Sequence, residues 1–460
     1  MQMVLSPGEP APPALAPIWP RIQQILAHLA ALRLDEPAMQ AQQRAALRDG
    51  RVLLPSLYPG RDSDACHQSW FFEDQVYFQF DAGPHGQHYA VTGLLDRGYS
   101  LDTIWFPQHG AAVTNCPIQI DGAKLERAHA MLAAAPKPPP GPDTPRLALG
   151  GFPHIMHVLW NELPALEQLE TEGLPPGVPL TIGALFQPFG PMAALFPGLA
   201  LHLRPMSLSG IPAANAAYGL VAALGAWQIP ATVQDRVLAL CRQHAAPAVL
   251  AARDRFRARH PAALWISVKP PNRTPSHQAD ALVALVTALA ERHPAHGFIL
   301  DGVSLPWDYP ANPNYEPWFH DALRSATEGS AAILADITAR LPPDVLQRTI
   351  RLNGLSVCNE AMWGEAATFY VCHGGTMHNK IGWLHRIPGF VHSNTAFLES
   401  MRWSPNPVPH SPPCHLATPA LIQDDEPAAY TALQLARKDQ NYTFTSQSRL
   451  LQEIIAALEA

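Results

Sequence analysis

The alternation of short apolar runs with helical segments in the second half of the chain is the strongest constraint on its fold. Five runs of strand length, rich in β-branched and aromatic residues, alternate there with stretches of helical periodicity. They are residues 263–268, 297–300, 349–352, 368–372 and 389–391. Strands that are separated by helices need right-handed crossovers, which place them side by side in a parallel sheet. The region therefore predicts a Rossmann-like α/β domain.

A shorter series of the same kind precedes it. Arg146–Gly150 predicts a strand that runs into Gly150-Gly151, a helical segment follows, and Leu180–Ile182 predicts the next strand. Two such series predict two Rossmann-like domains, over residues 146–250 and 262–416, that face each other across a cleft.

The flanking regions differ in character. Residues 1–135 combine an N-terminal helix with short β-rich runs between Ser69 and Ile120, which predicts a β-rich module. The proline-rich stretch Ala135–Pro145 predicts a linker. Residues 417–460 predict a C-terminal helical segment that ends in an amphipathic helix.

Composition excludes several classes of protein. The net charge is −7 and no block of lysines and arginines stands out, which argues against a nucleic-acid groove. No stretch of about 18 apolar residues predicts a membrane span, and the N-terminus does not resemble a signal peptide. Six scattered cysteines without a CxxC pair fit a reducing compartment and no zinc site. We therefore expect a cytoplasmic protein, with room for peripheral contact with a membrane face.

The segment Thr368–Lys380, with the sequence TFYVCHGGTMHNK, carries the clearest chemical pattern. A predicted strand ends at Cys372, and His373-Gly374-Gly375-Thr376 turns the chain into a helix. Glycines let backbone N–H groups approach an anion closely, and a helix N-terminus adds partial positive charge. Thr376 is expected to cap this helix and to donate to a phosphate oxygen. Lys380 is the last of the expected donor-binding residues in this segment. An ordinary βα turn also contains glycines, so the pattern alone leaves both interpretations open.

Two further strand ends carry suitable side chains. Lys269 and Arg273 lie just beyond the predicted strand 263–268, and ligands of open α/β sheets bind at that edge. The planar guanidinium of Arg273 matches phosphate oxygens. Ser356 follows the strand 349–352, where small residues leave room for a nucleotide. The alternative for both cations is a solvated loop.

The segment Gly150–Glu167 is the candidate for proton transfer. His154, His157 and Asn161 are spaced i, i+3, i+7 and share one face if the segment is helical. A histidine or the neighbouring Glu162 at a strand end could deprotonate an acceptor hydroxyl. The alternative is that His157 and Trp160 are core residues with local hydrogen bonds.

One metal-binding pattern is present in an unfavourable context. Asp62-Ser63-Asp64 has the spacing that metal-dependent sugar transferases use, but Pro59-Gly60 precedes it and no apolar strand does. We interpret it as a loop and expect no metal or other cofactor. The sequence contains no GxSxG, Walker A, GxGxxG or HExxH motif, which argues against hydrolases, nucleoside triphosphatases, dehydrogenases and zinc proteases.

These residues resemble those of GT-B-type glycosyltransferases. Tyr370–Asn394 (YVCHGGTMHNKIGWLHRIPGFVHSN) is similar to their C-terminal donor loop, helix and following strand. His154–Leu166 (HIMHVLWNELPAL) resembles a pattern in bacterial enzymes similar to glycosyltransferase family 61 and the heptosyltransferase-like enzymes. The resemblance covers about residues 146–400.

The resemblance implies a glycosyltransferase of polysaccharide or glycoprotein biosynthesis. Its C-terminal domain would hold a nucleotide sugar, with His373–Thr376 and Arg273 near the diphosphate. A glycan, lipid-linked or protein acceptor would approach the side of His154–Glu162, where Trp160 and Asn161 lie. GT-B enzymes generally need no bound metal. The Glu-x₇-Glu pattern of many retaining members is absent, which favours an inverting displacement.

Two questions stay open from the sequence, the class of protein and the identity of the base. The same donor site would serve a GT-B-like sugar-nucleotide epimerase or phosphorylase. A non-catalytic sugar-binding or scaffold protein is the third possibility. His157 or His154 is the expected base, with Glu162 as its partner or as the base itself.

Overall fold

A computed structural model describes most of the chain. It leaves out residues 1, 84–85, 94–97, 117–119, 135–140, 142, 151–153, 175–176, 404–405, 413, 432–433 and 436–437. Most of the predicted linker and Gly151 therefore lie outside the described residues. Among the helices that are described, none combines the length and the apolar character needed to cross a membrane.

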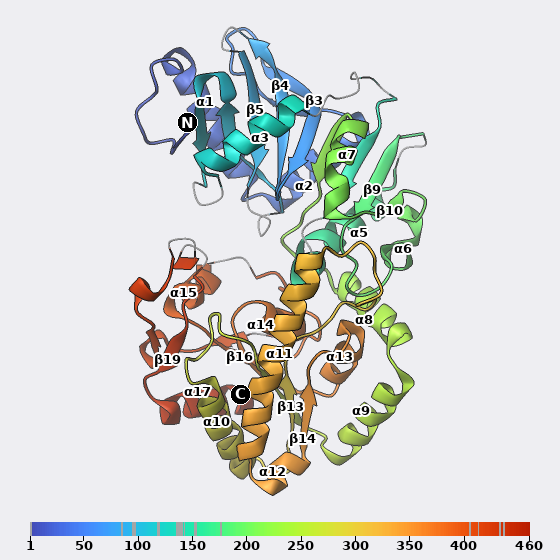
Figure 1. Ribbon diagram of the computed structural model, residues 1–460, viewed down its shortest axis with the longest axis vertical. Helices are drawn as coiled ribbons and strands as arrows, with labels where there is room; N and C mark the ends of the chain where they lie inside the picture. Colours follow the sequence, from blue (N-terminus) through green and yellow to red (C-terminus); the bar gives the residue numbers. More distant parts are fainter. Residues whose placement is uncertain are drawn as a thin grey trace. The chain divides into compact units, whose positions relative to one another are not determined.

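The chain divides into two compact units (Figure 1). Unit 1 comprises residues 1–186 and 192–228, and unit 2 comprises residues 187–191 and 229–460. The β-rich first part of the chain therefore belongs to the same unit as the first α/β series. Residues 229–250 belong to unit 2, although the sequence assigned them to the first α/β domain.

The predicted β-rich runs of unit 1 form a seven-stranded sheet of order β1-β7-β6-β5-β4-β3-β2. Its neighbours are antiparallel except for the parallel pair β1 and β7. The strands are β1 (Met3–Leu5), β2 (Val52–Pro55), β3 (Ser63–Phe72), β4 (Gln75–Gly83), β5 (Gly86–Thr92), β6 (Leu101–Phe106) and β7 (Ala111–Thr114). Trp70, Tyr77 and Trp105 pack on one face against Leu125 and Leu132 of α3 (Gly122–Ala134), which forms an aromatic core.

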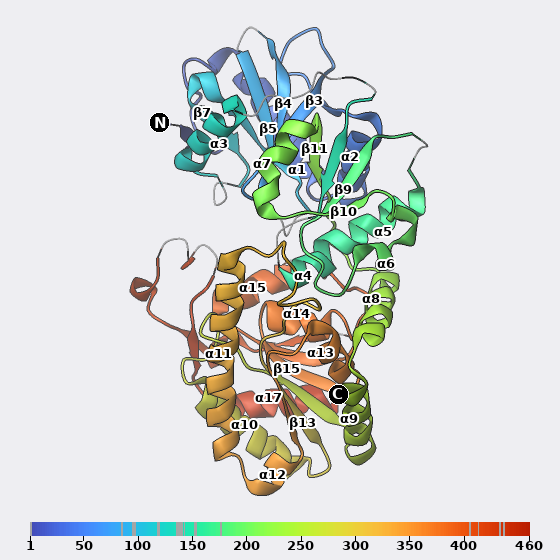
Figure 2. The same ribbon diagram turned by 45° about the vertical axis from the view of Figure 1, so that its right-hand side comes forward.

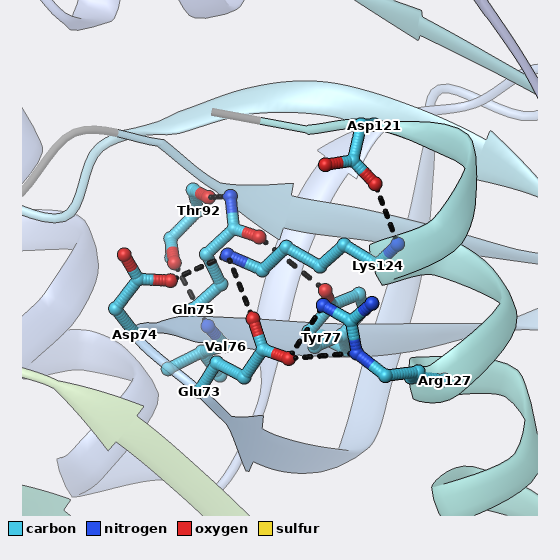
Figure 3. A network of polar contacts seen from close by, with 9 residues as sticks. All are labelled: Glu73, Asp74, Gln75, Val76, Tyr77, Thr92, Asp121, Lys124 and Arg127. Carbon is cyan, nitrogen blue, oxygen red and sulfur yellow. Dashed lines mark hydrogen bonds and ion pairs between the residues drawn. The ribbon is translucent and has the colours of Figure 1, made fainter. Parts of the chain in front are cut away.

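Ion pairs attach α3 to the turn between β3 and β4 (Figure 3). The ammonium of Lys124 lies 2.5 Å from Asp74 Oδ1 and 3.8 Å from Glu73 Oε2. Arg127 Nη2 lies 2.9 Å from Glu73 Oε1. The backbone N–H of Lys124 also donates to Asp121 Oδ1, at 2.7 Å. Because Lys124 is buried, we expect its pairs to hold the helix more firmly than the exposed Arg127 pair does.

The second sheet of unit 1 is parallel, with order β10-β9-β8-β11. Its strands are β8 (Arg146–Leu149), β9 (Leu180–Ala184), β10 (Leu203–Pro205) and β11 (Leu220–Ala223). The Ser69 hydroxyl of β3 donates to Val221 O at 2.5 Å and accepts from Val221 N at 2.8 Å. These bonds join the two sheets and explain why the β-rich region is not a separate unit. The other α-helices are α1 (Trp19–Leu32), α2 (Glu36–Asp49), α4 (Ile155–His157), α5 (Leu163–Glu172), α6 (Met192–Leu195) and α7 (Ile211–Ala217).

Unit 2 is built on a parallel sheet of order β14-β13-β12-β15-β16-β17 (Figure 2). Its strands are β12 (Ala263–Ser267), β13 (Gly297–Asp301), β14 (Thr349–Leu352), β15 (Phe369–His373), β16 (Gly389–His392) and β17 (Cys414–Leu416). Its α-helices include α8 (Ala231–His244), α9 (Pro247–Arg259), α10 (Gln278–Arg292), α11 (Pro317–Arg340), α12 (Pro343–Gln347), α13 (Val357–Gly364), α14 (Thr376–Gly382), α15 (Thr395–Trp403) and α17 (Gln447–Glu459).

Helices cover both faces of this sheet. Leu264 and Ile266 of β12 pack in one core cluster with α10, α11 and α17. Ala263 and Trp265, which alternate with them, pack in a second cluster with α9, α13 and α14. A parallel strand that is buried on both faces is typical of a doubly wound sheet. The second α/β series thus folds as its strand–helix pattern predicts.

The sequence predicted a helical C-terminal segment, but the segment also contains a pair of strands. β18 (Ile422–Asp424) and β19 (Tyr442–Phe444) pair antiparallel before α17 begins. Tyr442 is fully buried, and its hydroxyl contacts His392 Nδ1 at 2.5 Å. The segment therefore contributes to the core of unit 2 beside the carboxyl end of β16.

Candidate functional site

The carboxyl edge of the six-stranded sheet gathers the predicted donor-binding residues. Three adjacent strands, β12, β15 and β16, end at Ser267, His373 and His392. The chain continues from them into the Lys269–Arg273 loop, the Gly374-Gly375 turn and Ser393. In open parallel sheets, ligands bind beyond this edge.

Arg273 lies directly against the Gly374-Gly375 turn, which we call the glycine turn. Its terminal nitrogens are 3.6 and 3.7 Å from the position that a Cβ on Gly375 would occupy. Its guanidinium carbon lies 4.8 Å from the centre of the Phe397 ring. Nε donates to Asn272 Oδ1 at 3.1 Å and is 3.6 Å from Asp439 Oδ1. Within the described chain neither terminal nitrogen has a hydrogen-bond partner, so the fork that suits an oxyanion is unused.

The backbone of Arg273 is itself unusual. Its φ is +57°, in the left-handed region that non-glycine residues seldom occupy. Such a conformation persists only where its surroundings hold it in place. We take the stacking on Phe397 and the bond to Asn272 as the contacts that hold the side chain.

Lys269 supplies a second cation beside it. Its ammonium donates to Asn272 O at 2.9 Å, and its backbone is held by two hydrogen bonds with the Gln278 side chain. Burial lowers the pKa of Lys269 to about 7, repulsion by Arg273 adds to the effect, and Asp439 opposes it. An anion bound here would therefore favour the protonated lysine.

His373 is the last residue of β15 and not, as expected, part of the turn. Its Nδ1 lies 3.0 Å from Ser267 Oγ, and its buried Nε2 has no hydrogen-bond partner among the described residues. Burial, with nearby Lys269 next in importance, holds its pKa well below the ordinary value, so the ring is neutral. The buried Ser393 hydroxyl also lacks a partner in the described structure. Sequence reasoning missed Ser393 and Phe397, because no motif marks the end of β16.

The two glycines have different surroundings. Gly375 has φ +104° and ψ −147° and is the N-cap residue of α14. A Cβ on Gly374 would lie 2.5 Å from the Phe397 ring and 3.1 Å from Ser393 Cβ. Thr376 is the first residue of the helix, so it does not cap α14 as predicted. Only Gly375 faces the guanidinium of Arg273.

Two predicted donor-binding residues make other contacts instead. Ser356 is the N-cap of α13 and accepts from Asn359 N at 3.3 Å. Lys380 is buried, and its ammonium lies 2.7 Å from Asp301 Oδ1 and 3.1 Å from Glu360 Oε1. Both were expected near the nucleotide, and both are occupied by bonds that stabilise the protein itself.

The predicted proton-transfer segment lies in unit 1, after β8. His154 is extended and precedes α4, and Val158–Glu162 forms a π-helical turn, η4, that leads into α5. Pro164, in the first turn of α5, has no N–H to donate to an earlier carbonyl, and the helix is widened just before it. π-turns inside helices are frequent at functional sites.

The predicted neighbours on this segment do meet. The rings of His154 and His157 have centroids 4.8 Å apart, and His157 Nδ1 lies 2.9 Å from Asn161 Oδ1. Asn161 Nδ2 donates to Ala226 O at 2.7 Å, so its oxygen faces the imidazole. Nδ1 of His157 must then carry the proton, which makes Nε2 the acceptor nitrogen of the neutral ring. Trp160 stacks on His157 at 5.8 Å.

Glu162 differs from the histidines in exposure. It is fully buried, whereas His154 and His157 are half-buried. Its Oε2 is 2.7 Å from the position of a Cβ on Gly150, so the carboxylate lies against the end of β8. An acceptor can reach the histidines more readily than this carboxylate.

The Asp62-Ser63-Asp64 pattern is not wholly a loop. Ser63 and Asp64 begin β3, and buried Asp64 accepts from Leu57 N at 3.3 Å. Asp64 Oδ1 also lies 3.7 Å from Arg61 Nη1. In the part of the chain that the structure describes, no group of three histidine, cysteine or acidic side chains could hold a metal ion.

Comparison with known proteins gives only distant likenesses. No protein-family model and no curated protein matches the chain. A glycosyl transferase of family 9 from Veillonella parvula is 10% identical, covering 69% of this chain and 98% of its own, with a TM-score of 0.34. UDP-GlcNAc 2-epimerase from Methanocaldococcus jannaschii is 10% identical over 73% of this chain and 81% of its own, with a TM-score of 0.26. Anabaena Alr3699/HepE, solved with UDP and glucose, is 12% identical over 60% and 86%, also at 0.26.

TM-scores below 0.5 do not establish a shared overall fold. The α/β assignment therefore rests on the two parallel sheets themselves. The resemblance to glycosyltransferase family 61 stays a prediction.

Proposed function

We propose that the chain is a glycosyltransferase that uses a nucleotide-sugar donor, and that the reaction is inverting and independent of metal. The donor diphosphate is assigned to unit 2, at Arg273, Lys269 and the glycine turn. The acceptor, a glycan, lipid-linked glycan or protein, is assigned to the His154–Glu162 segment of unit 1. The observation that carries the proposal is the Arg273 fork, which faces Gly375 with two unbonded terminal nitrogens in the described structure.

The chemistry is a single displacement. Nε2 of His157 accepts the proton of the acceptor hydroxyl while the oxygen attacks the anomeric carbon. The bond from that carbon to the diphosphate oxygen breaks, and the nucleoside diphosphate leaves with the electron pair. Arg273 and Lys269 stabilise the charge that develops on this leaving group.

A nucleotide panel tests the donor assignment. Thermal unfolding with UDP, GDP, CMP and ADP is expected to show stabilisation by at least one of them, by about 2.7 kcal/mol at 100 times Kd. Incubation with the corresponding nucleotide sugar and candidate acceptors then identifies the reaction. A sugar that changes configuration without acceptor would establish an epimerase. The absence of any nucleotide effect would favour a scaffold.

Arg273→Ala is expected to weaken nucleotide binding by about 1.5 kcal/mol, because a charge-assisted hydrogen bond is lost from a partly exposed site. Arg273→Lys should recover only part of this loss, since the ammonium lacks the planar fork. Calorimetric titration measures both effects. Arg340→Ala, which removes an exposed arginine paired with Asp280, is the control and should bind normally. Equal affinity of wild type and Arg273→Ala would show that Arg273 is a surface residue.

Nucleotide affinity is expected to fall as the pH rises above about 7. The free protein holds Lys269 with a pKa of about 7, and a bound diphosphate raises that value. Above pH 7 binding must therefore take up a proton, so Kd rises by up to about tenfold per pH unit. Below pH 7 the lysine is already charged and this dependence vanishes. Lys269→Met should bind more weakly with a flatter profile, and a profile as steep as wild type would exclude Lys269.

Sugar transfer is expected to survive EDTA. Asp64 of the Asp62-Ser63-Asp64 pattern is buried, and its carboxylate accepts a hydrogen bond from the nearby Leu57 N–H, so it is already engaged within the protein. Initial rates with and without chelator, followed by added Mn²⁺, make the measurement. Loss of turnover that Mn²⁺ restores would contradict the metal-independent mechanism.

A further inference from the structure

The ammonium of Lys380 is surrounded by oxygen atoms from several segments of unit 2. It lies 2.7 Å from Asp301 Oδ1, 2.8 Å from Gly302 O, 2.8 Å from Ser304 Oγ and 3.1 Å from Glu360 Oε1. All three partner side chains are buried, and Lys380 is only 7% exposed. We call Asp301, Ser304, Glu360 and Lys380 the charge cluster.

The composition of the charge cluster is unusual, because two carboxyl groups face one ammonium. Full ionisation would leave an uncompensated negative charge in the core, which is costly. Burial raises the pKa of Asp301 well above its ordinary value, Lys380 opposes this, and a hydrogen bond with Glu360 adds to it. The Asp301 carboxyl therefore holds its proton more tightly than an ordinary aspartic acid does.

The charge cluster joins three elements of unit 2. Asp301 ends β13 and Ser304 follows it, Glu360 belongs to α13, and Lys380 belongs to α14. Trp265 of β12 fixes the other oxygen of Asp301, since its Nε1 donates to Oδ2 at 3.1 Å. Because α14 begins at Thr376, directly after Gly375, the bonds to Lys380 hold this helix about one turn beyond the glycine turn.

We propose that the charge cluster positions the glycine turn for the donor diphosphate, with Lys380 as a positioning residue and not a phosphate ligand. This inference rests on the proposed function. Its physical basis is that functional sites tolerate little displacement: a shift of about 1 Å caused by a distant mutation can lower the reaction rate roughly a hundredfold. A seven-residue helix has little stability of its own, so α14 depends on such anchoring.

Three variants separate positioning from simple stability. Glu360→Gln is isosteric and retains the pair of Lys380 with Asp301, so it is expected to bind inorganic pyrophosphate and UDP as wild type does. Asp301→Asn combined with Lys380→Met removes the ammonium that holds α14 together with the carboxyl group closest to it. It is expected to bind both probes about tenfold more weakly. Ser304→Ala should lose affinity in the same direction but less, and it preserves all three ionisable groups.

Two readouts accompany binding. Amide hydrogen exchange over residues 376–382 is expected to speed up in the double variant and to stay slow in Glu360→Gln, because the helix loses or keeps its anchor. Lys380→Met alone leaves a buried charge without compensation, so its Tm should fall by about 10 °C. Val286→Ala creates a cavity where α10 packs in the core and is the matched control for destabilisation. It should leave the affinities for pyrophosphate and UDP unchanged.

The outcomes are distinguishable. Wild-type affinity in the folded double variant overturns the positioning role, as does an equal loss of affinity in Val286→Ala. Unchanged exchange of α14 in the double variant and in Ser304→Ala overturns the anchoring itself. A wild-type protein that binds neither pyrophosphate nor UDP overturns the proposed donor site, whatever the exchange data show.

Discussion

His157→Ala is expected to lower the rate of sugar transfer by about 10²–10⁴-fold while nucleotide affinity stays at the wild-type value. The bond from His157 Nδ1 to Asn161 Oδ1, at 2.9 Å, leaves Nε2 as the acceptor for a hydroxyl proton. Affinity is unaffected because a base acts only after the donor has bound. Steady-state kinetics together with nucleotide titration gives both quantities.

Two companion variants identify the base. His154→Ala should lose less than His157→Ala, since His154 lies in extended backbone before α4, whereas Asn161 orients the His157 ring. Glu162→Gln keeps the shape of a fully buried side chain and is expected to retain most turnover. A larger loss in Glu162→Gln than in His157→Ala would make the carboxylate the base. Near-normal turnover in all three would reduce the segment to packing.

Gly375→Val is expected to weaken nucleotide binding by about 100-fold, the largest loss that we predict for the donor site. Its φ of +104° and ψ of −147° are essentially restricted to glycine, and a side chain there costs about 1–3 kcal/mol in strain. The new side chain also fills the space beside Arg273, where the Cβ position is 3.6 Å from the guanidinium. Titration with the nucleotide identified above gives the affinity.

Two other glycines provide the controls. Gly173→Val carries the same positive-φ strain, at φ +75°, in a place where a Cβ meets nothing within 4 Å, so nucleotide affinity should not change. Gly374→Ala is expected to act through overpacking against Phe397, with a loss of about 1–3 kcal/mol in stability. Wild-type binding by Gly375→Val would remove the glycine turn from the donor site.

Periodicity predicted the elements of unit 2 more closely than those of unit 1. β14 spans Thr349–Leu352, as the sequence pattern indicates, and β12 (Ala263–Ser267) ends one residue before the predicted run 263–268 does. Both alternate cleanly with their neighbours and are bounded by polar or proline-containing stretches. β10, β11 and β17 were not predicted.

The predicted donor residues divide according to what surrounds them. Arg273, Lys269 and Gly375 are brought together, because the ends of neighbouring parallel strands share an edge. Lys380 and Ser356 also follow strand ends in the sequence, but their side chains bond to other groups of the protein, Lys380 to Asp301 and Ser356 to the backbone of α13. No local pattern separates a lysine that awaits a phosphate from one that already has two carboxyl partners. That distinction needs the positions of Asp301 and Glu360, which lie 79 and 20 residues away along the chain.

The sequence by itself determined the parallel α/β architecture of unit 2, the β-rich character of the first part of the chain and the glycine turn between β15 and α14. Each of these follows from local periodicity and from backbone conformations that only glycine adopts. Only the tertiary structure decided that the β-rich region joins unit 1, that Lys380 is enclosed in the charge cluster, and that Ser393 and Phe397 adjoin the glycine turn. The reason is physical: these outcomes depend on contacts between strand ends far apart in the sequence, and burial then changes what each polar group can bind.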